Sequence, residues 1–184
     1  DSEPQHLMQF ALMGDVVARA LAGIDKPRIG LLNIGEEEIK GNDLIKQTHQ
    51  LLKLSNLNYV GYVEGDGIFK GEADVVICDG FVGNISLKTS EGVAKMMAHF
   101  IKQEINRNWL TKLTGVIAYP IWQGLKKKMN PSNYNGASLV GLTGIVIKSH
   151  GSADADSFAQ AVKVAIKAVE QDIPSLIAAN MAQS

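Results

Sequence analysis

The 184-residue chain has few of the features that mark several common classes of protein. Its single cysteine, Cys78, cannot form an intrachain disulfide and lies in an apolar run. We interpret it as a small buried hydrophobe in a reducing, cytoplasmic protein. The formal net charge of −1 argues against a broad nucleic-acid-binding surface. The N-terminus lacks a basic region followed by a long apolar one, so no secretory signal is expected.

Long apolar runs and common catalytic motifs are also missing. The longest uncharged run, Leu113 to Leu125, is shorter than the roughly 20 apolar residues of a membrane-spanning helix. Lys70 stands where a dinucleotide-binding fingerprint needs its third glycine, and Leu87 stands where a P-loop needs a glycine. The sequence contains no Gly-x-Ser-x-Gly elbow and no His/Cys cluster with metal-ligand spacing. A serine hydrolase or a zinc enzyme therefore has little support.

What the chain does contain is a repeated pattern in which a short apolar run leads through a polar loop into a helical stretch. The apolar runs at 29–34 and 74–78 predict buried strands, 59–63 alternates like a strand, and 140–147 predicts a hairpin or two short strands. This order predicts a mostly parallel α/β fold. Helices are expected at 4–22, 44–54, about 84–106 and 173–181. A further helix is expected after Asp154, with Phe158, Val162, Ala165, Ile166 and Val169 on its inner face.

If these strands are parallel, three polar loops meet at one edge of the sheet, together with the N-termini of the helices that follow. Such an edge favours an anion, and phosphate in particular. The cations and neutral hydrogen-bonding groups available there are Lys40, Lys88, Lys148, His150, Asn42, Asn84, Ser149 and Ser152. Each group also has a purely structural reading. Asn42, Asp43, Asn84, Ser152 and Asp154 are good helix caps, His150 suits a structural histidine, and Glu36 to Glu38 suit a solvated first turn.

The apolar segment 109–125 is the second feature of interest. Gly115, Pro120 and Gly124 break it, which predicts two short helical pieces forming a hairpin. Lysines flank its uncharged part, Leu113 to Leu125, at Lys112 and at 126–128. A dimer interface or a core helix is the first interpretation, and contact with a membrane surface is the second.

Four stretches of the chain carry a resemblance to a known family. They are Gly-Leu-Leu-Asn-Ile-Gly-Glu-Glu-Glu-Ile-Lys-Gly-Asn at 30–42, Val-Ile-Cys-Asp-Gly-Phe-Val-Gly-Asn at 76–84, Leu-Lys-Thr-Ser-Glu-Gly at 87–92 and Ile-Lys-Ser-His-Gly-Ser-Ala-Asp at 147–154. Together they closely resemble bacterial phosphate acyltransferases, whose members are nearly twice as long. The resemblance identifies residues 1–184 as the C-terminal part. It implies a Rossmann-like three-layer α/β/α sandwich, similar to phosphotransacetylase and isocitrate dehydrogenase, with a protruding helical hairpin at about 107–130.

The resemblance also implies an activity, the transfer of a fatty acyl group from acyl carrier protein to inorganic phosphate for phospholipid synthesis, with no cofactor and no metal. On this basis Lys40 and Asn84 are the predicted catalytic residues. The predicted phosphate- and substrate-binding residues are Glu36, Asn42, Asp79, Lys88, Ser149 and His150, with Glu36 and Asn42 holding Lys40. Expected partners are acyl carrier protein, a second copy in a homodimer, a peripheral membrane contact and a downstream glycerol-3-phosphate acyltransferase. The alternatives are a nucleotide-dependent dehydrogenase of related fold and a non-catalytic dimerisation or membrane-docking fragment.

Overall fold

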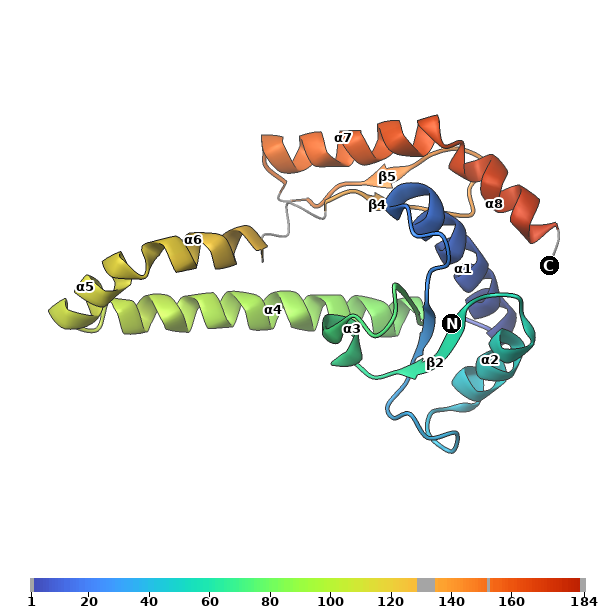
Figure 1. The fold of residues 1–184 in the computed structure, drawn as a ribbon, viewed down its shortest axis with the longest axis horizontal. Coiled ribbons are helices and arrows are strands. Elements are labelled where there is room, and N and C mark those ends of the chain that lie inside the picture. Colours follow the sequence, from blue (N-terminus) through green and yellow to red (C-terminus); the bar gives the residue numbers. More distant parts are fainter. Residues whose placement is uncertain (1, 129–134, 152, 183–184) are drawn as a thin grey trace. The chain divides into compact units, whose positions relative to one another are not determined.

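A computed structural model of the chain describes residues 2–128, 135–151 and 153–182 (Figure 1). The chain divides into two compact units. The first consists of residues 1–83 and 135–184, and the second of residues 84–134.

A three-stranded parallel sheet organises the first unit within the described residues. Strand β1 lies in the middle of the order β2-β1-β3, so the parallel arrangement predicted from the sequence is confirmed. Leu31 in β1 lies opposite Tyr62 in β2 and Ile77 in β3. The elements in chain order are α1 (Pro4–Val17), a π-helical turn η1 (Ala18–Ala22), β1 (Ile29–Leu32), α2 (Asp43–Leu54), β2 (Tyr59–Val63), α3 (Gly67–Lys70) and β3 (Val75–Ile77).

Helices α1 and α2 pack against each other and against the sheet (Figure 1). Leu7 and Ala11 of α1 meet Ile29 and Leu31 of β1, and all four are fully buried. Each fully buried leucine or isoleucine side chain in this set contributes about 1.5–3 kcal/mol. This core fixes β1, and with it the point at which the chain leaves the sheet after Leu32.

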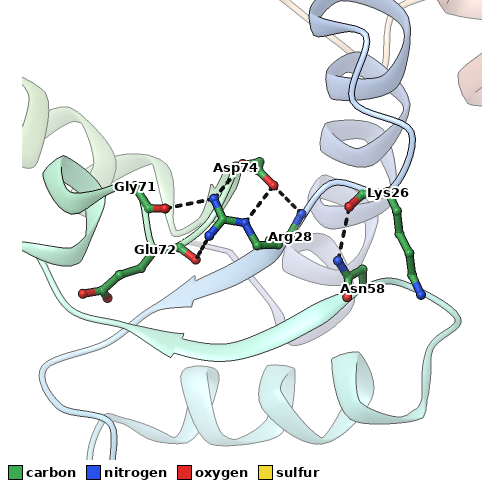
Figure 2. Close-up of polar contacts among 6 residues, drawn as sticks. All are labelled: Lys26, Arg28, Asn58, Gly71, Glu72 and Asp74. Carbon is green, nitrogen blue, oxygen red and sulfur yellow. Dashed lines mark hydrogen bonds and ion pairs between the residues drawn. The ribbon is translucent and has the colours of Figure 1, made fainter.

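A polar network joins the amino ends of the three strands (Figure 2). The guanidinium group of Arg28 donates to both carboxylate oxygens of Asp74, at 2.8 and 3.1 Å, and to the carbonyl oxygens of Gly71 and Glu72. The side-chain amide of Asn58 donates to the carbonyl oxygen of Lys26 at 3.2 Å. These bonds tie the segments before β1, β2 and β3 at the edge opposite the strand ends.

Replacing Arg28 should weaken the fold in a pH-dependent way. Hydrogen bonds from Arg28 lower the pKa of Asp74 from 3.8 to about 2. A carboxyl group whose pKa is lower in the folded than in the unfolded state stabilises the fold above its unfolded pKa, and this contribution disappears as the pH falls toward the folded pKa. We expect Arg28→Gln to lower the Tm at pH 5, and the difference from wild type to shrink as the pH falls toward 2. Lys26→Gln is the control, and a pH-independent difference for Arg28→Gln would contradict the assignment.

The C-terminal part of the first unit corrects the bounds of one sequence prediction. The hairpin or pair of short strands predicted at 140–147 is present as β4 (Ala137–Ser138) and β5 (Ile147–Lys148), which pair antiparallel in a separate two-stranded sheet. Most of 140–147 is the loop between them, where Gly141 adopts a positive φ of 81° and the chain turns. The third polar loop therefore does not follow a strand of the parallel sheet.

Helix α7 (Ala155–Glu170) corrects a second prediction, because its large apolar residues are not the ones it buries. It packs through small residues, with Ser157, Ala161 and Ala168 buried. The predicted inner residues Phe158, Val162, Ile166 and Val169 are exposed. A second core holds α7 to α1 and to α8 (Ile173–Met181), and its buried members are Met13, Val16, Ala168, Ile173 and Ile177.

The second unit contains most of α4 (Gly80–Ile105), together with α5 (Trp109–Ile117) and α6 (Tyr119–Lys128). Helix α4 begins at Gly80, not at about residue 84, so the predicted loop at 79–84 is wrong and Asn84 lies within a helix. The predicted break of the 109–125 segment into two short helices is confirmed. No residue of α4 or α5 is buried. Among the described helices, none is both long enough and apolar enough to cross a membrane.

Candidate functional site

The candidate site begins at the edge of the parallel sheet where the strands end. Leu32, the last residue of β1, lies opposite Val63, the last residue of β2. Leu31 lies opposite Ile77, the last residue of β3. The loop after β1 and the residues after β3 thus leave the sheet at the same edge. Open α/β sheets bind their ligands at this edge.

A buried asparagine that the sequence analysis did not single out holds the 34–42 loop. Asn33 is only 8% exposed, and its Nδ2 donates to the carbonyl oxygens of Gly35 at 3.0 Å and Lys40 at 3.4 Å. Gly41 passes close to the same amide: a Cβ at Gly41 would lie 2.5 Å from Asn33 Oδ1, and its φ of +86° favours glycine. One side chain therefore fixes the turn that presents Lys40.

Lys40 is exposed on this loop, and its backbone N–H donates to the carbonyl oxygen of Glu37 at 2.9 Å. Within residues 2–128, 135–151 and 153–182, its ammonium group has no hydrogen-bond or ion-pair partner. Glu36 is exposed on the same loop. Asn42 caps α2, because its Oδ1 accepts from the backbone N–H of Ile45 at 3.0 Å. The structural interpretation of Asn42 as a helix cap is thus confirmed, and the hydrogen bonds to the backbone of Lys40 come from Asn33 and Glu37.

The outer side of the loop is tied to α2. Glu38 forms an ion pair with Lys53 at 2.7 Å, and this lysine lowers the pKa of the Glu38 carboxyl. The pair is exposed, so its contribution to stability is small. Together with Asn33 on the inner side, it limits the positions open to the loop.

Asp79 follows β3 and begins α4. Its carboxylate accepts from the backbone N–H of Ser2 at 3.0 Å and of Phe81 at 2.8 Å. The side chain of Ser2, followed by these two backbone groups, lowers the pKa of Asp79. The early start of α4 follows from this capping, because it satisfies an amide of the first turn. Cys78 is half-buried, not fully buried as predicted, and burial, with a smaller effect of Asp79, raises the pKa of its thiol.

Asn84 and Lys88 both lie on α4, in the second unit, and both are exposed. They are one helical turn apart, which puts them on the same side of the helix. Lys88 pairs with Glu91 at 3.0 Å. Asn84 is not the cap of α4, because the helix begins four residues earlier.

A second buried asparagine organises the loop that carries Ser149 and His150. Asn135 is 8% exposed, and its Nδ2 donates to Ser149 Oγ at 2.9 Å and to the carbonyl oxygen of Ser157 at 2.8 Å. Its Oδ1 accepts from the backbone N–H of His150 at 2.8 Å. Asp154 caps α7, as its structural reading predicted. Ser152 lies outside the described residues.

The structure thus places the predicted residues in three groups. Glu36, Lys40 and Asn42 share the 34–42 loop, with Asp79 at the same sheet edge. Ser149 and His150 share the loop held by Asn135, and Asn84 and Lys88 share one face of α4. The sequence contains one signal for the role of Asn33, because its amide directly follows the apolar run that predicts a buried strand.

Comparison with known proteins identifies the family. Residues 1–176 match the model of a family described as "Fatty acid synthesis protein". The chain belongs to this family. It is 59% identical over 184 residues to a phosphate acyltransferase of Alcanivorax borkumensis, covering all of this chain and 54% of that protein.

Two further relatives show similar coverage. The phosphate acyltransferase of Alkalilimnicola ehrlichii is 58% identical over 177 residues, which is 96% of this chain and 52% of that protein. The phosphate acyltransferase of Halorhodospira halophila is 53% identical over 182 residues, 98% of this chain and 53% of that protein. The chain of this fatty acid synthesis family member thus spans about half the length of the curated relatives it matches.

Proposed function

We propose that the complete protein is a phosphate acyltransferase, which moves a fatty acyl group from acyl carrier protein to inorganic phosphate. The observation that carries this proposal is the identity of 53–59% over nearly the whole chain to proteins of that name. Lys40 lies on a loop held by a buried amide, and its ammonium group has no partner in the part of the chain that the structure describes, so it is the kind of group the reaction needs.

The chemistry requires little from the protein besides binding and charge stabilisation. An oxygen of hydrogen phosphate attacks the thioester carbonyl carbon, and the carbonyl oxygen becomes an oxyanion. The carbon–sulfur bond then breaks, giving acyl phosphate, and the proton of hydrogen phosphate ends on the thiol of the carrier protein. Positioning and electrostatic stabilisation account for large parts of such rate enhancements. Lys40 would stabilise negative charge on phosphate or the oxyanion, and Asn84 would donate a hydrogen bond to the oxyanion.

The proposed binding residues serve the approach of phosphate and of the carrier's pantetheine arm. These are Glu36, Asn42, Asp79, Lys88, Ser149 and His150. Asn42 and Asp79 also cap helices, so their substitution would affect stability as well as binding.

The test of this function is the phosphate dependence of thioester consumption. With full-length protein and acylated carrier protein, we expect thioester loss only when phosphate is present, with acyl phosphate as the product. The measurement is carrier-protein thioester and acyl phosphate by mass spectrometry, with chloride matching the ionic strength. Equal thioester loss in phosphate-free buffer would rule out direct attack by phosphate.

The proposed architecture is one half of a larger α/β/α sandwich. The exposed apolar row of Phe158, Val162, Ile166 and Val169 on α7 supports this proposal, because such rows pack against a neighbouring layer. The remaining half of the length of the relatives would supply that layer. The predicted appendage at about 107–130 falls within the second unit.

We also propose that α5 and α6 form a hairpin that contacts a bilayer surface. Ile117 and Ile121 are 73% and 72% exposed, and apolar side chains flanked by basic residues suit an interfacial position.

The double change Ile117→Asp and Ile121→Asp should abolish co-sedimentation of the protein with anionic vesicles. The control is the double change Thr114→Asp and Gln123→Asp on the same helices, which should largely retain binding. Retained binding by the isoleucine variant, or its collapse from dimer to monomer, would assign this face to a dimer interface.

A further inference from the structure

The backbone around the buried side chain of Asn135 fixes the orientation of its amide. The Oδ1 atom accepts from the backbone N–H of His150, and Nδ2 donates to the carbonyl oxygen of Ser157, both at 2.8 Å. A backbone N–H can only donate, and a backbone carbonyl oxygen can only accept. Exchanging the amide oxygen and nitrogen would therefore place donor against donor and acceptor against acceptor. Only one orientation of the amide satisfies both bonds.

This orientation decides the direction of a third hydrogen bond. The Nδ2 atom also donates to Ser149 Oγ at 2.9 Å. Since an amide nitrogen does not accept, the hydroxyl of Ser149 must be the acceptor in this contact. Its own proton has to point elsewhere, and it has no acceptor among the described residues. Ser149 is only half-buried, so its hydroxyl is held as a hydrogen-bond donor for a ligand.

The surroundings of this hydroxyl favour a negatively charged oxygen. The nitrogen that binds Ser149 also binds Ser157 in the first turn of α7, so Ser149 Oγ lies beside the N-terminus of this 16-residue helix. The positive end of a helix dipole attracts anions. The Asp154 carboxylate that caps α7 is bound by the backbone N–H and the hydroxyl of Ser157. A donating hydroxyl at this position suits an oxygen of phosphate.

We propose that Asn135 is a positioning residue for the proposed acyl transfer, and that it holds the hydroxyl of Ser149 so that this group donates to an oxygen of inorganic phosphate. The inference rests on the proposed function and deepens it in two respects. It assigns Ser149 to inorganic phosphate and not to the pantetheine arm. It also adds Asn135, which lies outside the four stretches that carry the family resemblance.

The test measures two quantities with the full-length protein, at an ionic strength kept constant with chloride. The first is the affinity for inorganic phosphate, obtained from the rise of the Tm with phosphate concentration. The second is the KM for phosphate and for acylated carrier protein, obtained from initial rates of thioester loss. Ser149→Ala should weaken phosphate binding and raise the KM for phosphate about tenfold, the effect of losing one hydrogen bond to a charged group. The KM for the carrier protein should stay unchanged.

Two further serine variants serve as controls. Ser149→Thr keeps the hydroxyl and should retain most of the phosphate affinity. Ser55→Ala removes another half-buried hydroxyl with two hydrogen bonds, at the C-terminal end of α2. This change should alter neither the phosphate affinity nor either KM.

Asn135→Ala should act on phosphate through Ser149. Alone it should weaken phosphate binding, because the hydroxyl of Ser149 loses the donor that sets its direction. In the Ser149→Ala background it should cause no further loss of phosphate affinity, since interacting residues are not additive. It should still lower the Tm measured without phosphate, because the carbonyl oxygen of Ser157 loses its donor.

Three results would overturn the proposal. They are an unchanged phosphate affinity in Ser149→Ala, an equal effect of Asn135→Ala in both backgrounds, and a raised KM for the carrier protein in place of that for phosphate. The last result would assign Ser149 to the phosphodiester of the pantetheine arm. Failure of the proposed function gives a different result, in which phosphate binding depends on Ser149 but thioester is consumed without phosphate.

Discussion

Lys40→Ala in the full-length protein is expected to lower phosphate-dependent acyl transfer by about 10²-fold or more, the scale of removing one group that stabilises an oxyanion. The Tm should change little. The side chain of Lys40 is exposed, and the bond that holds its residue in place goes to its backbone carbonyl oxygen. Initial rates of thioester loss and thermal melts on the same preparation provide the measurement.

Two matched variants sharpen this expectation. Lys40→Arg keeps the positive charge and should retain more activity than Lys40→Ala. Lys26→Ala removes an exposed lysine at the opposite edge of the sheet and should leave the rate unchanged. A Tm that falls in step with the rate in Lys40→Ala would give Lys40 a structural role.

Asn84→Ala should show the same pattern as Lys40→Ala, with a rate loss of about 10²-fold and an intact fold. The structural argument differs, because Asn84 lies inside α4 and is exposed there. Alanine is the better helix former, so the change should not weaken α4. An unchanged rate would remove Asn84 from the proposed machinery.

Asn33→Ala is expected to cost about 1–3 kcal/mol of stability, because it leaves the carbonyl oxygens of Gly35 and Lys40 without their buried donor. It should also lower the acyl-transfer rate, since the turn that presents Lys40 loses its inner tie. Asn33→Asp keeps the shape of the side chain but removes both donors, and should behave similarly. Urea denaturation and rate measurements test the two effects.

Asn135→Ala is the matched control for the stability effect. Asn135 is as buried as Asn33 and makes a comparable set of bonds to another loop. It should cost a similar amount of stability, and it is a control for stability alone, because the loop that it holds carries Ser149 and His150 of the proposed binding site. If Asn33→Ala melts like wild type, the amide does not hold the loop.

Local sequence patterns determined most of the elements of the first unit. The β-branched and alternating runs located β1, β2 and β3 within one or two residues, since a short buried strand has a local signature. Capping chemistry is equally local, and Asn42 and Asp154 cap α2 and α7 as their spacing predicted. The alternation of strands and helices then required a parallel sheet.

Only the tertiary structure decided which groups hold the two loops and which faces are covered. The bonds of Asn33 and Asn135 join residues up to 22 positions apart, and such contacts leave no periodic trace in the sequence. Periodicity showed that α7 has an apolar face, but not that the helix would pack through alanines and leave Phe158 exposed. It also could not separate β4 and β5 from the parallel sheet. An apolar pattern records that a residue favours burial, whereas the partner that buries it is set by the rest of the fold.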